Sequence, residues 1–159
     1  MRYAHLALSA AAALALAGCY SFTGGTLAYK TIGVPVAGNT TGEYRATDAV
    51  TKAMIAALTA DGRVKVIEPQ DAESRLELDV TGYRREPHVY DRQEVVSQYR
   101  VTITVKAAYR GKADKAVWSA DSLSAWAAYQ AESETEAAGI EKAASNLAAE
   151  ILRRAFETW

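Results

Sequence analysis

Residues 95–109 read VVSQYRVTITVKAAY, and this stretch decides the fold. Its residues alternate in character between two faces. One face holds the apolar set Tyr99, Val101, Ile103, Val105, Ala107 and Tyr109, and the other holds the polar set Gln98, Arg100, Thr102, Thr104 and Lys106. A strand with one apolar and one polar face is typical of an antiparallel sheet that is covered on one side only. We therefore expect a half-covered sheet built around residues 95–109.

The strands next to this stretch follow from the same alternation. Residues 75–83 place Leu76, Leu78 and Val80 on one side, and a polar segment at residues 84–93 separates them from residues 95–109. The two strands are expected to form a long hairpin with a charged tip. After a turn at residues 111–115, a further strand is expected at about residues 116–125.

A strand–helix–strand unit precedes the hairpin. Residues 30–36 alternate as a strand through Ile32, Val34 and Val36, and Pro35 marks a sheet edge or the end of the strand. Residues 43–60 carry a helical apolar stripe that Gly62 can end in a left-handed cap. A short strand follows at residues 63–68. Elements this close together predict a right-handed crossover with parallel strands.

The last segment predicts a second helix. Ser133 and Glu136 have the spacing of a capping box, and an apolar stripe follows through Ile140, Ala144, Leu147, Ile151 and Ala155. The order is then β-α-β-β-β-β-α. It predicts an α+β fold in which two helices pack on one face of a mixed four- to five-stranded sheet.

The N-terminus has the pattern of a lipoprotein signal peptide. Arg2 precedes an Ala- and Leu-rich run that is shorter than the about 20 residues of a transmembrane helix. The run ends in Leu16-Ala17-Gly18-Cys19, which resembles the bacterial lipobox. We expect residues 1–18 to be the signal peptide, residues 19–29 a tether lipidated at Cys19, and residues 30–159 a single domain. The alternative is an ordinary secretory signal with a chance cysteine.

Little in the sequence suggests catalysis. His88 is the one histidine left after signal cleavage, no nucleophile elbow is present, and no second cysteine exists. Glu132, Glu134 and Glu136 lie where a helix begins, so they are interpreted as complementing its dipole. We expect no enzymatic activity, cofactor or metal. The net charge of −1 also argues against nucleic acid as a partner.

A cluster of cationic side chains lies at the predicted hairpin tip. Arg84, Arg85, His88 and Arg92 fall within nine residues, mixed with tyrosines. Arginine can bind phosphate groups with two parallel hydrogen bonds. The alternative is a solvated loop that acidic neighbours partly neutralise, and composition alone favours this alternative.

Particular stretches of the chain resemble the LptE family of lipopolysaccharide-assembly lipoproteins. They are residues 18–22, residues 30–36 with Asn39, residues 61–66, Tyr83, Glu86-Pro87, Tyr90-Asp91, residues 99–103, Trp118, Trp126 and the last helix with Trp159. The resemblance implies a lipoprotein on the periplasmic side of the outer membrane, anchored through Cys19. It also implies a plug lodged inside the LptD β-barrel that helps to deliver lipopolysaccharide to the outer leaflet.

The same resemblance points to ligand contacts. The family's basic residue at the hairpin tip corresponds to Arg92, seven residues before Tyr99, and Arg84, Arg85 and His88 are further candidates for contact with the lipopolysaccharide headgroup. A second basic position of the family lies just before the last helix. Residues 131–134 hold no lysine or arginine there, so that contact is not predicted.

Two other functions remain open at this point. Residues 34–39 have the Val-Pro-x-x-x-Asn pattern of CsgG-like and cell-wall-synthase-activating lipoproteins, which would make the chain a periplasmic interaction module. A hydrolase that uses His88 is the third possibility.

Overall fold

The computed structural model describes residues 28–156. The predictions for the signal peptide, for lipidation at Cys19 and for Trp159 lie outside these residues. The elements run in the order β1 (Thr31–Gly33), β2 (Gly38–Asn39), α2 (Tyr44–Asp61), β3 (Lys65–Val66), β4 (Ser74–Tyr90), β5 (Val96–Arg110), the short 3-10 turn η2 (Lys112–Asp114), β6 (Ala116–Gln130) and α3 (Glu136–Phe156).

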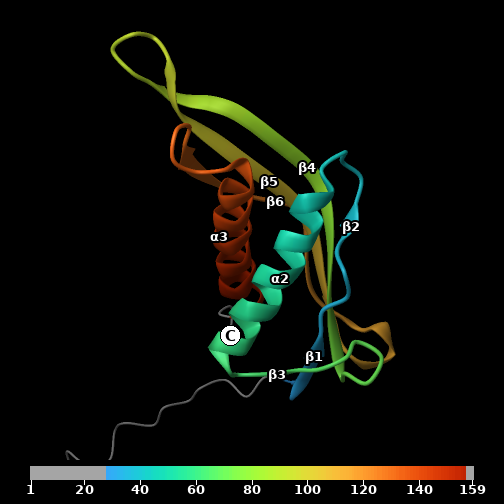
Figure 1. The fold of residues 1–159 in the computed structure, drawn as a ribbon. Helices are drawn as coiled ribbons and strands as arrows, with labels where there is room; N and C mark the ends of the chain where they lie inside the picture. Colours follow the sequence, from blue (N-terminus) through green and yellow to red (C-terminus); the bar gives the residue numbers. More distant parts are fainter. Residues whose placement is uncertain (1–27, 157–159) are drawn as a thin grey trace, which may run out of the picture.

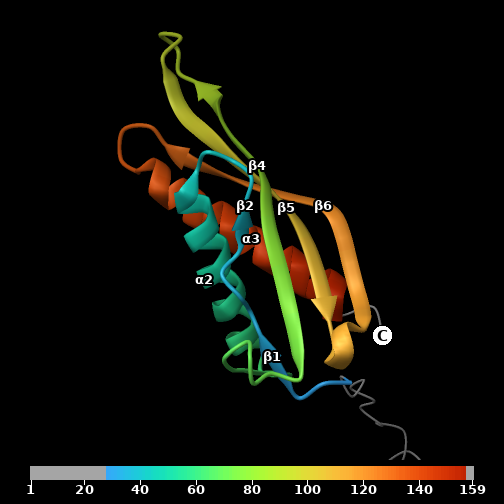
Figure 2. The same cartoon turned by 90° about the vertical axis from the view of Figure 1, so that its right-hand side faces the viewer.

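Within the described residues the strands form one six-stranded mixed sheet, and both helices cover the same face of it (Figures 1 and 2). The predicted α+β class is thereby confirmed. The strand count is one above the expected range because residues 30–36 do not form a single strand. No helix between residues 28 and 156 has the length and apolar character needed to cross a bilayer.

The sheet order is β3-β1-β4-β5-β6, and β2 lies beside β4. β1 pairs in parallel with both β3 and β4, whereas β4, β5 and β6 are antiparallel. The predicted parallel pairing of the strands that flank α2 is confirmed. Pro35 separates β1 from β2, and the chain between them turns Val36 outward, so that this residue is 78% exposed. The prediction that residues 30–36 form one alternating strand through Val36 is therefore wrong.

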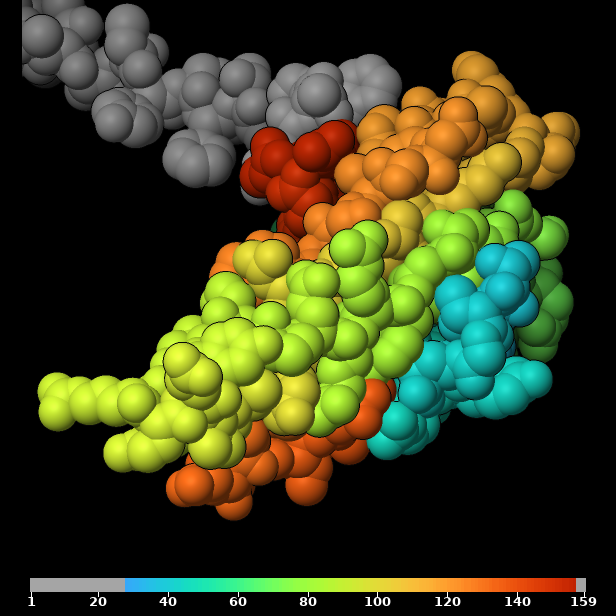
Figure 3. All heavy atoms as spheres, turned by 90° about the horizontal axis from the view of Figure 1, so that it is seen from above, coloured from blue at the N-terminus to red at the C-terminus, as the bar shows by residue number. Residues whose placement is uncertain are grey.

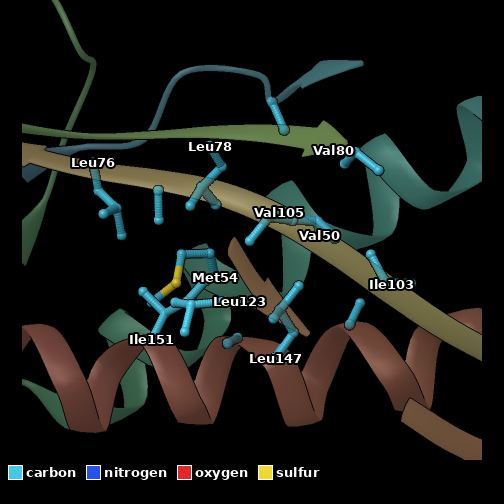
Figure 4. Packing of buried hydrophobic residues seen from close by; sticks show 14 of the residues in the cluster. Val50, Met54, Leu76, Leu78, Val80, Ile103, Val105, Leu123, Leu147 and Ile151 are labelled. Carbon is cyan, nitrogen blue, oxygen red and sulfur yellow. The ribbon is translucent and has the colours of Figure 1, made fainter. Parts of the chain in front are cut away.

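The core lies between the sheet and the two helices. Figure 4 shows Leu76 and Leu78 of β4 and Val105 of β5 facing Leu147 and Ile151 of α3. The apolar faces predicted for β4 and β5 are buried here, except that Tyr99 is only partly buried. The apolar stripe predicted for the last helix is buried as well. The alternation of residues 95–109 thus decides which face of the sheet receives the helices.

The start of α3 differs from its predicted cap. The hydroxyl of Thr135, rather than Ser133, accepts a hydrogen bond from the Ala138 amide at 3.2 Å, so the predicted capping box is wrong. Glu43 caps α2 through the Arg45 amide at 3.0 Å. At the other end of α2, Gly62 takes the predicted left-handed conformation with φ of 71°. The first amides of a helix have no partner within the helix, and in each helix a nearby polar side chain accepts a hydrogen bond from one of them.

The hairpin is longer than the sequence indicates. β4 continues to Tyr90 and β5 begins at Val96, so only residues 91–95 form the turn. At about 3.3 Å per residue, the 17 residues of β4 extend about 55 Å. Figure 1 shows this hairpin projecting past the ends of α2 and α3. Arg84, Arg85 and His88 therefore lie on a strand, and the prediction that they belong to a loop is wrong.

A β-bulge at Thr81 changes which residues of β4 face the helices. Val80 pairs with Val105 and Gly82 with Thr104, so β4 advances two residues where β5 advances one. Before the bulge the even-numbered residues of β4 face the helices, and after it the odd-numbered ones do. Tyr83 and Arg85 consequently lie on the helix side. Arg84 and Glu86 lie on the face that no helix covers, which is called the open face below.

Candidate functional site

The turn at the hairpin apex is organised by Asp91. Its carboxylate accepts hydrogen bonds from the amides of Gln93 at 2.8 Å and Val95 at 2.9 Å, and its own amide donates to the Val95 carbonyl at 2.8 Å. Glu94 adopts a positive φ of 60° to close the turn. Arg92 is exposed at this apex and has no hydrogen bond or ion pair with any residue between 28 and 156. In Figure 3 the hairpin end stands out from the rest of the surface.

Arg85 lies in a network on the helix side, here called the tyrosine stack and made of Arg85, Tyr99 and Tyr129. The guanidinium carbon of Arg85 lies 3.7 Å from the Tyr99 ring centroid, and Nε donates to the Tyr129 hydroxyl at 2.6 Å. The rings of Tyr99 and Tyr129 stack with centroids 5.7 Å apart. Arg85 of β4 is thus held by contacts with Tyr99 of β5 and Tyr129 of β6.

Glu136, the first residue of α3, joins the tyrosine stack to α2. It accepts a hydrogen bond from the Tyr83 hydroxyl at 2.5 Å, and it lies 3.8 Å from Arg85 and 3.5 Å from Arg45. Burial of the ring, together with the carboxylate of Glu136, raises the pKa of Tyr83 above its usual range. The hydrogen bond to Tyr129 raises the pKa of Arg85 above its usual range. This network connects the base of the hairpin to both helix starts.

A second cationic group lies on the open face, and it is called the Arg100 cluster. Its members are Arg84, Glu86, His88, Arg100 and Trp126. The guanidinium carbon of Arg100 lies 4.3 Å from the Trp126 ring, and the His88 ring lies 5.6 Å from the same ring. Glu86 is shared by Arg84 at 3.8 Å and Arg100 at 3.7 Å. Nε of Arg100 is buried and has no hydrogen-bond partner in the described part of the chain.

The four predicted headgroup contacts therefore do not form one site. Arg92 lies at the apex, Arg84 and His88 lie on the open face, and Arg85 lies on the helix side, because the bulge and the strand alternation send neighbours in opposite directions. Arg100 and Trp126 join His88 and were not singled out as ligand contacts from the sequence. The available signal was the alternation of β5, which already assigned Arg100 to the polar face.

The segment before α3 is acidic in sequence but has a cation beside it. Glu134 accepts a hydrogen bond from the Gln130 amide at 2.9 Å and forms an ion pair with Lys142 of α3. Its pKa is lowered mainly by that lysine and also by the Gln130 amide. The Ala131 amide donates to the Ser97 carbonyl at 3.0 Å, which holds the segment against the hairpin base. A lysine from the helix thus reaches the region where residues 131–134 supply none.

The described residues hold no cluster of side chains that could bind a metal ion. Between residues 28 and 156, no three histidine, cysteine, aspartate or glutamate side chains converge in the way that metal ligands do. His88 contacts an indole ring, not a carboxylate that would orient it as a general base. The geometry offers cationic and aromatic binding surfaces.

Comparisons with known proteins identify a family and a shared fold. The model of a family named LptE and described as lipopolysaccharide-assembly matches residues 29–155. A comparison with curated protein sequences found no match.

Solved structures with the same fold have low sequence identity to the chain. PelC from Paraburkholderia phytofirmans, solved as a dodecamer, is 21% identical, with a TM-score of 0.57 over 84% of this chain and 92% of its own. A minor lipoprotein from Acinetobacter baumannii is 18% identical, with a TM-score of 0.50 over 81% and 92%. Lipoprotein B from Nitrosomonas europaea is 11% identical, with a TM-score of 0.50 over 80% and 83%. Identities this low establish the shared fold alone.

Proposed function

The chain belongs to the LptE family of lipopolysaccharide assembly, and from this premise we propose that it binds lipopolysaccharide through the apex of its β4–β5 hairpin. The observation that carries the proposal is the position of Arg92. Its guanidinium is exposed at the far end of the hairpin and has no partner among residues 28–156. An unpaired arginine can bind a phosphate group with two hydrogen bonds without first breaking an ion pair.

Arg84 and His88 extend the proposed contact along the open face. The Arg84 side chain is 74% exposed, and its ion pair with Glu86 is long. Trp126, which is 47% exposed beside His88, offers an aromatic surface to a sugar ring. We give Arg85 a different part in the proposal, because Tyr99 and Tyr129 already hold its guanidinium. It supports the hairpin that carries the other residues.

The proposed anchor is Cys19, with residues 1–18 removed as a signal peptide and residues 19–29 serving as a tether. Figure 1 supports this arrangement, because β1 lies at the end of the domain opposite the hairpin apex. A lipid at Cys19 would hold one end of the domain at the periplasmic side of the outer membrane. The hairpin would then reach away from the anchored end.

The proposed protein partner is the LptD β-barrel, in which the chain acts as a plug. The open face supports this role, since it presents Thr102, Thr104 and Lys106 of β5 to a polar surrounding. Extraction in mild detergent tests it. We expect an outer-membrane barrel to co-purify with the chain, and recovery of the chain alone would contradict the plug. The family role is assembly and transport, so the proposal includes no catalytic step.

The ligand proposal is tested by titrating the purified chain with lipopolysaccharide. Arg92→Asp is expected to weaken binding by tenfold or more, which corresponds to about 1.4 kcal/mol. Arg75→Asp is the matched control, because Arg75 is also exposed but lies at the start of β4, far from the apex. Equal affinities for the two variants would remove Arg92 from the site.

A second candidate function is a self-assembled periplasmic ring, which corresponds to the interaction module considered from the sequence. It is supported by the fold shared with PelC, a protein solved as a dodecamer. Native mass spectrometry of the detergent-extracted chain separates the candidates. A particle of many identical subunits favours the ring, and a complex of one chain with one barrel favours the plug.

A further inference from the structure

The apex of the β4–β5 hairpin carries apolar residues that the fold leaves exposed. Val89 is 40% exposed, Tyr90 57% and Val95 61%, and the partly exposed Val96 lies opposite Tyr90 in the strand register. These four residues are called the apex patch. None of them belongs to the buried core or packs against it. Packing within residues 28–156 therefore does not account for their apolar character.

Exposed apolar residues are concentrated in the apex patch. Seven large hydrophobic residues between positions 28 and 156 are 37% exposed or more, and three of them lie within the seven positions 89–95. The other four are scattered between positions 36 and 126. Single exposed apolar residues are ordinary on a protein surface, whereas a cluster of them marks a contact surface. The apex patch is therefore a candidate contact surface.

The turn inside the apex patch satisfies most of its own backbone amides. The Asp91 carboxylate accepts from the amides of Gln93 and Val95, the Asp91 amide donates to the Val95 carbonyl, and the Glu94 amide donates to the Asp91 carbonyl at 3.2 Å. Four of the five amides of residues 91–95 are thus bonded within the turn. An unpaired amide is costly in hydrocarbon, so this turn suits apolar surroundings. A partner that adds a β-strand would instead need free amides.

A cation lies inside the same turn. Arg92 is exposed between Tyr90 and Val95 and has no hydrogen bond or ion pair within residues 28–156. An arginine can lay its stem along an apolar surface and keep its guanidinium among polar groups. A tyrosine ring suits the boundary between hydrocarbon and polar groups. The complementary ligand therefore has an anionic group next to hydrocarbon chains.

We propose that the apex patch contacts the acyl chains of lipopolysaccharide while Arg92 binds a phosphate group at their base, an inference that rests on the proposed function. The order of groups along the hairpin fits this orientation of the ligand. Apolar residues and Arg92 lie at the apex, and Arg84, His88 and Trp126 lie further down on the open face. The acyl chains then meet the apex, and the sugar rings lie along the open face.

Titrations with two forms of the ligand test the acyl contact. The full chain, in detergent at a fixed concentration, is titrated with lipopolysaccharide and with the same material after alkaline deacylation. We expect the unchanged chain to bind the acylated form at least tenfold more tightly. Val89→Thr combined with Val95→Thr is expected to remove most of this preference and to leave the affinity for the deacylated form unchanged. Threonine keeps the shape and strand preference of valine, so the hairpin is retained.

Two controls separate this inference from the proposed function. Val36→Thr changes an apolar residue that is 78% exposed but lies outside the hairpin, so it should keep the full acyl preference. Arg92→Asp should weaken binding of both ligand forms by the same factor. Equal affinity of the unchanged chain for both forms, or an equal loss for both in the apex double variant, overturns the acyl contact. An ineffective Arg92→Asp beside a retained acyl preference contradicts the phosphate contact and supports the apex patch.

A fluorescent reporter tests the surroundings of the apex patch directly. Tyr90→Trp places an indole in the patch, and its emission is obtained as the difference from the unchanged chain. We expect that emission to move to shorter wavelength with acylated lipopolysaccharide and to stay in place with the deacylated form. Tyr44→Trp, at a position that is 79% exposed at the start of α2, should not respond. An equal response to both forms, or to phosphatidylglycerol vesicles without lipopolysaccharide, overturns the proposal.

Discussion

The guanidinium carbon of Arg85 lies 3.7 Å above the centroid of the Tyr99 ring, at the point where the hairpin leaves the helices. The Tyr129 ring stacks on the Tyr99 ring, and the Tyr129 hydroxyl accepts a hydrogen bond from Arg85 at 2.6 Å. An arginine expected to meet a ligand thus holds β4, β5 and β6 together.

Removal of Arg85 should destabilise the protein measurably. Arg85→Ala loses the cation–π contact and leaves the Tyr129 hydroxyl without its partner, at a cost of about 1–2 kcal/mol in the free energy of unfolding. Arg84→Ala is the matched control, because Arg84 is the neighbouring residue on the open face and is 74% exposed. Urea unfolding of both variants measures the difference in their free energies of unfolding. Equal midpoints would show that the contacts of Arg85 with Tyr99 and Tyr129 do not stabilise the fold.

Gly139 of α3 should not tolerate a methyl group. A Cβ there would lie 2.5 Å from Cδ1 of Tyr129, whose ring is buried and stacked. Alanine favours a helix by about 1 kcal/mol over glycine, but overpacking in a filled core costs about 1–3 kcal/mol. We expect Gly139→Ala to lower the free energy of unfolding. Gly42→Ala, where nothing lies near the added atom, should be neutral, and a stabilised Gly139→Ala would contradict this packing.

Tyr83 should make stability depend on alkaline pH. Burial and the carboxylate of Glu136 raise its pKa in the folded protein above the ordinary value of about 10. The neutral phenol is therefore favoured by folding, and this contribution is complete below pH 10 and is lost as the pH rises further. Urea midpoints between pH 9 and 11 should fall less steeply for Tyr83→Phe than for the unchanged chain. Parallel slopes would refute the assignment.

Acid should weaken the fold through carboxylates that are paired with cations. Lys142 lowers the pKa of Glu134, and Arg153 together with Arg154 lowers that of Glu150. Each such pair contributes stability above the ordinary glutamate pKa of about 4.3, and the contribution is lost as the pH falls through the lowered value. Lys142→Gln should flatten the dependence of the urea midpoint on pH between 5 and 3. Lys115→Gln, at an exposed site, should leave the slope unchanged.

The sequence was sufficient to predict the half-covered sheet, because the alternation of β5 and the stripe of α3 each match one buried face. It could not predict the bulge at Thr81, which is decided by register against β5 and not by local composition. Without the bulge, Arg84 and Arg85 exchange faces. For the same reason the sequence grouped four cations into one site, whereas the structure separates them.

The predicted strand boundaries were wrong where contacts with other parts of the fold determine them. β4 continues through charged residues because β5 pairs with them, and near the apex both faces of the hairpin are exposed to solvent. Pro35 interrupts the first strand and turns Val36 outward. The family was recognisable from short stretches distributed over the chain. Each stretch alone is a weak signal, but their order and spacing together are specific enough to indicate the family. Lys142 was missed because helix packing, not sequence proximity, brings it to Glu134.

The most direct test of the central claim is photocrosslinking in intact cells from the hairpin apex. A photoreactive residue in place of Gln93 lies beside Arg92, and one in place of the exposed Gln70 lies between β3 and β4, remote from the apex. We predict lipopolysaccharide crosslinks from position 93 that disappear when Arg92→Asp is added, and none from position 70. Equal crosslinking from both positions, or crosslinks at position 93 that persist without Arg92, would contradict the claim that this arginine contacts the ligand.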